Sequence, residues 1–538
     1  MPGHLFITRG DIRHLACEAW LLPTAADVHV RRLWFKDDKR LRAVIESGRH
    51  LDVRSSTPGW RGGDTRVALL LPATTPARDG GELACPAVWL ANVGGHERTE
   101  ASWLVEAVVD FVRAAGPDAA QRVDRDRRDR PLLAIPLVGT GHGGGARRKG
   151  EIARELVRQL EPVLEEIHVD VVLVTQNPEA FAAAQRARRM HWGHRWEARW
   201  RDAFAETSEE TSPGDPIKTG MALAKQARRG RLVLFVGAGV SAGAGLPQWT
   251  TLLEQLAANL DLPVEEMKSL GALDRATVIA TALEREHRSV GDAVAAQIPD
   301  GPYSLAHSLI ATLPVTEVIT TNYDRRLEDA AVDCGRPFTV LDSAPLAAAD
   351  RWLLKLHGSV TKPDDIVLTR EDYLGYGQRR AALRGIVQAM LITRHMLFVG
   401  FGMSDDNFHA IAHDVRQALR SGERNQPMDP FGTALLVRER ALFDKLWKGD
   451  IAALALAPEA SDVGVGARRV DLLLDFVLAE AESALTYFMD PAFTDLLSPE
   501  ERGLRSALQD LRQLPDDTSP VWLALSDFLK RLGRPGAD

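Results

Sequence analysis

Residues 231–249, RLVLFVGAGVSAGAGLPQW, constrain the fold of this chain more than any other stretch. Leu232–Val236 is an unbroken run of apolar β-formers, which predicts a buried parallel strand because both faces of such a strand need cover. The next residues fit G-x-G-x-x-[G/A], with Gly237, Gly239 and Ala242 in the three fixed places. A strand, a glycine-rich turn and a helix in this order can bring backbone amides close to a diphosphate.

Three more predicted strands in the same half of the chain end in polar or glycine-rich sequences. Residues 315–321 lead into TTNYD, residues 352–356 into HGS, and residues 396–399 into GFGMSDDN. In a doubly wound sheet, ligands lie beyond the carboxyl ends of the strands, so the four loops are expected along one edge. No clear acidic residue for a ribose follows the first motif at the usual spacing.

The motifs GAGVSAGAGLPQW, TTNYD, LHGS and VGFGMSDDN, in this order, resemble the sirtuin fold. They are most similar to its bacterial branch of NAD-consuming defence effectors, and the similarity covers about residues 217–480. The resemblance implies a sirtuin-like Rossmann parallel sheet with a small helical module, formed by residues 249–259, 276–286 and 303–313. It also implies NAD as the substrate and a role in anti-phage defence by NAD depletion.

The resemblance assigns roles to residues of the four loops. His357 is expected to be the catalytic base, and imidazole suits that task because it titrates near neutral pH. Asn322 is expected to orient the ribose hydroxyls and a water, since its amide both donates and accepts. The other residues expected to bind NAD are Gly237, Ala238, Gly239, Ser241, Pro247, Trp249, Thr321, Asp324, Gly358, Gly400, Ser404 and Asp405. Ser404 and Asp405 are assigned to the adenosine end, and helix capping is the alternative for both and for Asp324.

Two departures from the sirtuin deacylases bear on the reaction. The cysteines Cys17, Cys85 and Cys334 are scattered without a C-x-x-C pair, so we expect neither a zinc ribbon nor another metal site. The deacylases usually follow G-x-P with an acidic residue, an aromatic residue and an arginine, whereas this chain has PQWT. Both differences favour water as the nucleophile and predict a NAD glycohydrolase. The alternatives are a non-catalytic sensor of NAD or ADP-ribose-derived signals that acts through a partner, and a zinc-free deacylase.

Residues 1–190 alternate predicted strands and helices, which is typical of a three-layer α/β/α domain. GDI after the first strand, PTAAD after the second and IPLVGTGHGGG before a long helix resemble a macro domain, whose family binds ADP-ribose. The implied second site for an ADP-ribose-like ligand consists of Asp11, Ile12, Gly139, Thr140, Gly141 and Gly143. Asp27, where the family usually has asparagine, and VHVRRLWFKDDKR in place of a glycine-rich loop argue against hydrolysis of ADP-ribosyl groups. A purely structural macro-like domain is the alternative.

Two further segments complete the expected domain plan. Residues 191–216 contain a tryptophan-rich helix and a polar linker, ETSEETSPGDP. Trp192, Trp196 and Trp200 share one helix face, which predicts packing between domains or protomers. Residues 481–538 form a helical tail with two amphipathic helices, which must dock on the body or on another subunit, so a homo-oligomer or a defence partner protein is expected.

The charge and hydropathy patterns exclude some classes of partner. The formal net charge is -8, and the basic run RVDRDRRDR is interleaved with aspartates, so nucleic-acid binding is not expected. The N-terminal sequence MPGHLFITRGDIRH has no apolar signal region, and no apolar stretch is long enough to span a bilayer. We therefore expect a cytoplasmic protein without a membrane segment.

Overall fold

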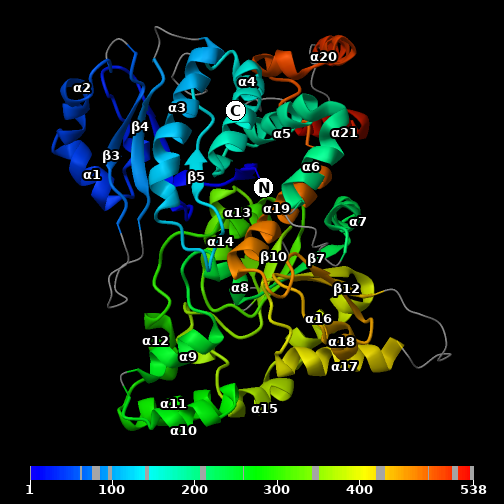
Figure 1. Cartoon of the computed structure of the whole chain (residues 1–538). Helices are drawn as coiled ribbons and strands as arrows, with labels where there is room; N and C mark the ends of the chain where they lie inside the picture. The colour runs from blue at the N-terminus through cyan, green and yellow to red at the C-terminus, as the bar shows by residue number, and fades with distance from the viewer. Residues whose placement is uncertain are drawn as a thin grey trace. The chain divides into compact units, whose positions relative to one another are not determined.

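The computed structural model describes residues 2–60, 63–74, 85–94, 100–139, 145–205, 214–258, 260–341, 350–419, 430–482, 484–511 and 519–533. The chain forms two compact units (Figure 1). Unit 1 comprises Met1–Arg125, Asp129–Thr207 and Glu482–Asp538, and unit 2 comprises Asp126–Arg128 and Ser208–Ala481.

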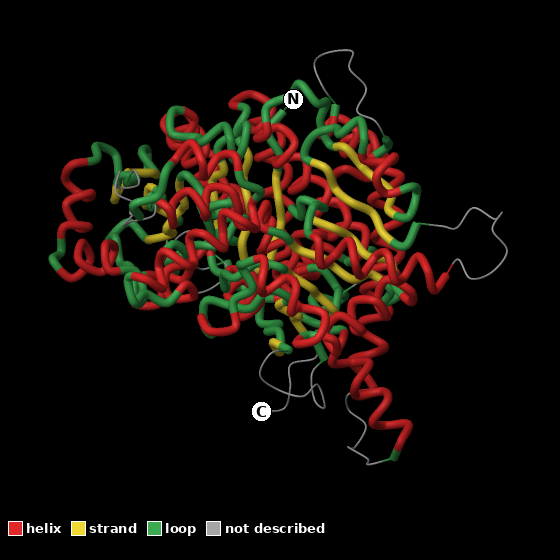
Figure 2. The backbone as a smooth tube through the Cα atoms, turned by 90° about the horizontal axis from the view of Figure 1, so that it is seen from below, coloured by secondary structure: helices red, strands yellow, loops and turns green. Residues whose placement is uncertain are grey.

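Unit 2 is built on a seven-stranded sheet with the order β13–β12–β11–β7–β8–β10–β9. Every pair of neighbouring strands in it is parallel. The strands are β7 (Leu232–Val236), β8 (Glu317–Thr320), β9 (Thr339–Val340), β10 (Trp352–Lys355), β11 (His395–Val399), β12 (Gly432–Leu436) and β13 (Ile451–Ala455). The strands of the two units lie among surrounding helices (Figure 2), which confirms the predicted α/β class.

Strand β7 occupies the centre of this sheet, and its position follows from its sequence. All five of its residues are buried, as an apolar run with cover on both faces requires. Phe235 packs against Phe398 of β11 with ring centroids 5.4 Å apart, and against Phe408 at 5.2 Å. The register sets Val236 opposite Val399 of β11 and Thr320 of β8, so the three strands end level with one another.

Thirteen helices in the described part of unit 2 accompany the sheet. They are α7 (Pro216–Arg228), α8 (Ala238–Ala242), α9 (Trp249–Ala257), α10 (Val264–Ser269), α11 (Ala272–Arg285), α12 (Val290–Ala296), α13 (Leu305–Thr312), α14 (Arg326–Asp333), α15 (Arg370–Arg379), α16 (Ala381–Thr393), α17 (Asp406–Leu419) and α19 (Val463–Ala481), together with the single-turn α18 (Phe443–Trp447). Helices α9 to α12 gather apart from the strands (Figure 1), and α9, α11 and α12 bury a core of their own.

The composition of this helical module differs in one helix from the expectation. Residues 303–313 were assigned to it, but α13 packs against α14 and α19 instead. All eight residues of α13 are buried, and a helix that is buried all round needs neighbours on every side. The module therefore consists of α9 to α12, and α13 belongs to the body of unit 2.

Unit 1 contains a six-stranded sheet with the order β1–β6–β5–β2–β4–β3, in which only β3 is antiparallel to its neighbour. Its strands are β1 (Leu5–Arg9), β2 (Ala19–Thr24), β3 (Val67–Leu71), β4 (Ala87–Asn92), β5 (Leu132–Ile135) and β6 (Asp170–Thr175). Its helices in the N-terminal segments are α1 (Lys39–Glu46), α2 (Val53–Ser56), α3 (Ala101–Ala120), α4 (Lys149–Ile167), α5 (Pro178–Trp192) and α6 (Trp196–Phe204).

The C-terminal tail is part of unit 1. The 3₁₀ segment η7 (Pro491–Leu496) packs on α4 and α5, and a Cβ at Gly150 would lie 3.1 Å from the Cα of Phe493. Arg186 of α5 contacts both carboxylate oxygens of Glu501 at 3.0 Å. Glu501 belongs to α20 (Pro499–Leu511), which is followed by α21 (Pro520–Arg531). The start of the tail thus docks on α4 and α5, while Leu504 of α20 and Val521, Leu523 and Phe528 of α21 keep exposed apolar side chains.

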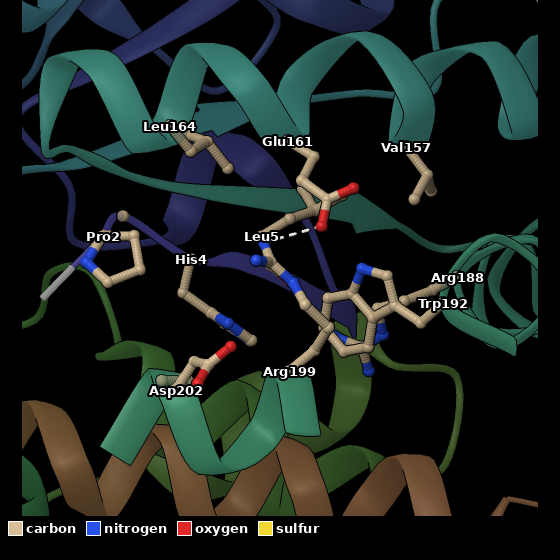
Figure 3. Close-up of a pocket in the computed structure, with 12 residues that line it drawn as sticks. Pro2, His4, Leu5, Val157, Glu161, Leu164, Arg188, Trp192, Arg199 and Asp202 are labelled. Carbon is tan, nitrogen blue, oxygen red and sulfur yellow. Dashed lines mark hydrogen bonds and ion pairs between the residues drawn. The ribbon is translucent and has the colours of Figure 1, made fainter. Parts of the chain in front are cut away.

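The three tryptophans of the predicted aromatic face form a cluster within unit 1. The rings of Trp192 and Trp200 are 5.5 Å apart, those of Trp196 and Trp200 are 5.9 Å apart, and the Arg188 guanidinium lies 5.1 Å from the Trp200 ring. Figure 3 shows a small cavity beside this cluster, where Arg199 pairs with Glu161. Its volume of about 30 Å³ suits about one water, so the cluster packs the unit and is no nucleotide site.

None of the helices in the described ranges has both the length and the apolar character needed to cross a membrane.

Trp200→Ala is expected to destabilise unit 1 by about 3–5 kcal/mol, because its fully buried ring leaves a large cavity. Urea unfolding followed by far-UV circular dichroism measures the change. Leu374→Ala removes a side chain that is 80% exposed and serves as the control, for which we expect less than about 0.5 kcal/mol. Equal stability of the two variants would contradict the structural role of the tryptophan cluster.

Candidate functional site

A cavity of about 870 Å³ lies at the carboxyl ends of the central strands of unit 2. This volume is within the usual range of ligand pockets, and the position is the one at which parallel α/β sheets bind ligands. Twelve of the fourteen residues predicted for the NAD site line the cavity: Ala238, Gly239, Ser241, Pro247, Trp249, Thr321, Asn322, Asp324, His357, Gly400, Ser404 and Asp405. The two that do not are Gly237 and Gly358.

The glycines of the first and fourth loops are needed chiefly because the two loops touch. A Cβ on Gly237 would lie 2.6 Å from the carbonyl oxygen of Gly400, and one on Gly239 would lie 2.9 Å from the Gly400 Cα. The amide of Gly239 donates to the Gly400 carbonyl at 2.9 Å. Because the Gly239 amide already donates to a carbonyl of the protein, it is not free to donate to a diphosphate, which was the contact expected of this turn.

Gly358 shapes the loop that carries His357. Its φ of +87° is left-handed, and a Cβ there would lie 2.4 Å from the carbonyl oxygen of Asp365. Only glycine fits this conformation and this space without strain. Gly358 therefore acts by turning the chain directly after His357.

Asn322, Ser241 and Asp324 form one hydrogen-bonded group at the wall of the cavity. The Ser241 hydroxyl donates to Asp324 Oδ2 at 2.7 Å and accepts from Asn322 Nδ2 at 3.0 Å. Asn322 Nδ2 also donates to the carbonyl of Gly237 at 3.1 Å. Both amide hydrogens of Asn322 are thus used, and its buried Oδ1 has no partner among the described residues.

Asp324 contacts both the first glycine-rich loop and the start of the next helix. Its Oδ2 belongs to the group around Ser241, and its Oδ1 accepts from the backbone amide of Arg326, the first residue of α14. The carboxylate therefore links the start of this helix to the first glycine-rich loop, which keeps the TTNYD loop against the end of β7.

Lys355 holds the TTNYD loop through hydrogen bonds to its backbone. The sequence analysis did not single out this residue. Its side chain is 1% exposed, donates to the carbonyls of Tyr323 and Asp324, and pairs with Glu328 Oε1 at 2.8 Å. The Tyr323 hydroxyl donates to the carbonyl of Val367 at 2.7 Å. A lysine within the otherwise apolar run WLLKL is the signal from which a buried, paired lysine could have been predicted.

His357 lines the same cavity and lies beside an unexpected neighbour. Its Nε2 is 3.4 Å from Asp405 Oδ2, a residue that the sequence assigned to the adenosine end. The Tyr373 hydroxyl donates to the same carboxylate at 2.8 Å, and the Tyr373 ring centroid lies 5.5 Å from that of His357. Asp405 Oδ1 accepts from the amide of Phe408, so Asp405 also caps α17.

The environment of His357 keeps its imidazole neutral. Burial lowers the pKa of His357, the Asp405 carboxylate raises it, and the Arg380 guanidinium lowers it, with a net shift below the ordinary value near 6.5. A neutral imidazole at pH 7 can accept a proton, and the nearby carboxylate stabilises the imidazolium that results.

Four charged residues that line the cavity were missed by the sequence analysis: Arg438, Glu439, Arg440 and Glu459. The first three begin two residues after the end of β12, so the rule that residues at the carboxyl ends of strands face ligands applied to them as well. Arg440 donates to the carbonyl of Gly402 at 3.0 Å, which ties this rim to the fourth loop.

The second predicted site, in unit 1, is described only in part. Thr140, Gly141 and Gly143 lie outside the described residues. Gly139 follows β5 with a φ of +71°, and Ile12 is buried. The Asp11 carboxylate accepts from the backbone amide of Arg13 at 3.0 Å and from its guanidinium at 2.9 and 2.5 Å. Burial raises the pKa of Asp11, but these bonds outweigh it and the pKa is lowered, so Asp11 is ionised and already engaged within the chain.

Asp405→Asn is expected to lower the pKa of His357 further, because the carboxylate that favours the imidazolium is lost while asparagine still caps α17. An NMR titration of protein with labelled histidine measures this pKa, with His357→Gln to assign the signal. Asp406→Asn changes the adjacent, exposed carboxylate and is the matched control. An unchanged or raised pKa in Asp405→Asn would show that Asp405 does not act on His357.

Part of this chain is similar in sequence to known proteins. Residues 316–449 match the model of a SIR2-like domain. The chain is 30% identical over 202 residues to Defense-associated sirtuin 2 of Bacillus subtilis, which covers 36% of this chain and 20% of that protein. It is 27% identical over 215 residues to NAD(+) hydrolase ThsA of Bacillus cereus (strain MSX-D12), covering 37% of this chain and 43% of the relative.

A second NAD(+) hydrolase ThsA, from Cytobacillus dafuensis, is 26% identical over 197 residues, or 36% of this chain and 39% of the relative. The chain thus spans less than half the length of these curated relatives. The domain model matches residues 316–449, and the loops of the parallel sheet converge on one cavity. The chain therefore contains a SIR2-like domain. This domain is homologous to these NAD(+) hydrolases and to this defence-associated sirtuin.

Proposed function

We propose that unit 2 is a NAD glycohydrolase that cleaves NAD to nicotinamide and ADP-ribose. The observation that carries the proposal is that one cavity is lined both by a buried, neutral imidazole, His357, and by Asn322, whose buried amide oxygen has no partner among the described residues. An unpaired buried acceptor costs about 1–3 kcal/mol, and a ribose hydroxyl or a water bound there would remove that cost.

The cavity fits NAD in its size and in the chemistry of its lining. Its volume of about 870 Å³ is large enough for a dinucleotide. Trp249 and Tyr323 offer aromatic faces, while Ser241, Asn322 and the charged rim around Arg438 offer polar groups. Apolar walls with a few placed polar groups are typical of cofactor-sized sites.

The reaction requires little acid catalysis. When the bond between ribose C1′ and the nicotinamide nitrogen breaks, the electron pair leaves with nicotinamide as a neutral molecule, and positive charge builds up on the ribose. A water then bonds to C1′ and gives up a proton, which His357 accepts in this proposal. Asn322 holds the ribose or the water, and the gain comes from orientation at a fixed site.

The biological role proposed here is anti-phage defence by NAD depletion, and the names of the relatives support it. Since a permanently active NADase would be toxic, we propose that assembly into a homo-oligomer, a defence partner protein or a bound nucleotide controls it. The cell compartment in this proposal is the cytoplasm, where NAD is abundant.

His357→Ala and Asn322→Ala are each expected to lower the rate of nicotinamide release from NAD by at least about 100-fold, because each removes a group placed at the reacting ribose. Chromatography of the reaction products measures the rate. His413→Ala changes an exposed histidine of α17 and serves as the control, with wild-type activity expected.

Three results would separate the alternatives. Wild-type protein that binds NAD without releasing nicotinamide would indicate a sensor. Release that requires an acylated peptide would indicate a deacylase. Full activity of folded His357→Ala would contradict the assignment of the base.

We further propose that unit 1 contains a macro-like domain that senses an ADP-ribose-like signal. In support, Asp11 follows β1 and Gly139 follows β5, and β1 and β5 both flank β6 in the parallel part of the sheet. Carboxyl ends of parallel strands lie at the same edge, which brings these two residues to one side of the unit.

Added ADP-ribose is therefore expected to change the rate of NAD cleavage by the wild-type chain, and Asp11→Ala is expected to remove this dependence. The control is Asp27→Ala, which changes the second, atypical position and leaves Asp11 and its contact with Arg13 in place. The same dependence on ADP-ribose in Asp11→Ala and wild type would discard the sensor role and leave a structural domain.

A further inference from the structure

A second histidine lies directly behind the group formed by Asn322, Ser241 and Asp324. His307 is the third residue of α13, has no exposed surface, and does not line the cavity. Its ring stands between the first residues of its own helix and the first glycine-rich loop, with Nε2 at 3.4 Å from the Ser241 hydroxyl. The sequence analysis gave it no role.

The protonation state of His307 follows from its contacts. The backbone amide of Ser304 donates to Nδ1 at 3.2 Å as part of a capping box at the start of α13, and the Ser304 hydroxyl lies 2.8 Å from the same nitrogen and can donate to it as well. Since a backbone amide only donates, Nδ1 must be the acceptor, and a neutral ring then carries its proton on Nε2. Burial lowers the pKa of His307 to about 4, so the ring is neutral at pH 7.

This tautomer fixes the direction of the next bonds. Nε2–H can only donate, so the Ser241 hydroxyl accepts from His307 and sends its own proton to Asp324. The remaining lone pair of Ser241 then accepts from Asn322 Nδ2, which keeps that side of the amide away from the substrate. The amide oxygen of Asn322 is the group left for a ligand.

We propose that His307 is a positioning residue, which orients Asn322 through the hydroxyl of Ser241. The inference rests on the proposed NAD cleavage for its kinetic effect, and it adds a residue outside the cavity to the groups that this reaction needs. Ser304 lies between the two parts of this arrangement, with its hydroxyl oxygen 2.8 Å from His307 Nδ1 and 3.0 Å from the carbonyl oxygen of Val240.

Two substitutions of His307 separate positioning from helix capping. Glutamine is a usual residue at this place of a capping box, and its side chain can accept from Ser304 and donate to Ser241. Asparagine is shorter: its oxygen can replace Nδ1 in the cap, but its amide does not reach Ser241. We expect kcat to fall about tenfold in His307→Asn with less than a twofold change in KM, and to stay within about threefold of wild type in His307→Gln.

A double-mutant cycle tests whether the effect passes through Ser241. In the Ser241→Ala background, His307→Asn is expected to cause no further loss of kcat, because the bond that it would break no longer exists. Thermal unfolding of all variants checks that the fold is retained. Wild-type kcat in His307→Asn, or the same tenfold loss in the Ser241→Ala background, would overturn the proposal.

A measurement that does not depend on catalysis tests this inference independently of the proposed NAD cleavage. The side-chain amide of Asn322, labelled with ¹⁵N and assigned with Asn322→Asp, is expected to shift in His307→Asn and to stay in place in His307→Gln. An unshifted signal in His307→Asn would refute the positioning role even if NAD is cleaved. If NAD is not cleaved by the wild type, a shift in His307→Asn alone would still support it.

Discussion

The site depends on the direct contact between two glycine-rich loops. Gly237 and Gly239 follow β7 and Gly400 follows the adjacent strand β11, and the backbones are so close that a Cβ at any of the three would overlap neighbouring atoms. The carbonyl of Gly400 accepts the amide of Gly239, so the loops hold each other as a pair. With these loops fixed, Ser241 and Asp405 project into one cavity from two different strand ends.

Two sets of polar residues line this cavity, one around Asn322 and one around His357. Around Asn322, Ser241 links the amide group to His307 and Asp324, and the amide oxygen has no partner among the described residues. Around His357, burial and the Asp405 carboxylate act on the pKa in opposite directions, and burial prevails. In the proposed function, the acceptor on Asn322 orients a ligand and the imidazole of His357 takes up a proton. This combination fits glycosidic cleavage, in which orientation and a modest base are the main needs.

Much of this arrangement was predictable from the sequence, because strand ends in a parallel sheet follow a simple rule. The apolar run Leu232–Val236 is β7 with the predicted bounds, and the three polar strand ends reach the same cavity. The rule gives the edge at which a residue lies but not its neighbours there. The contact of Asp405 with His357 was therefore not predicted. The contact of His307 with Ser241 was not predicted either, because it depends on how α13 packs, and no sequence motif indicates that packing. The docking of the tail on α4 and α5 was equally beyond a pattern that shows only an amphipathic helix.

The central claim is that the cavity at the ends of β7, β8, β10 and β11 binds NAD with its nicotinamide ribose between Asn322 and His357. The most direct measurement is a crystal structure with a NAD analogue in which a methylene group replaces the ring oxygen of that ribose and prevents cleavage. The account predicts a ribose hydroxyl or an ordered water within hydrogen-bonding distance of Asn322 Oδ1, with His357 facing the same sugar. An analogue bound outside this cavity, or bound with its nicotinamide end at the rim formed by Arg438 and Glu439, would contradict it.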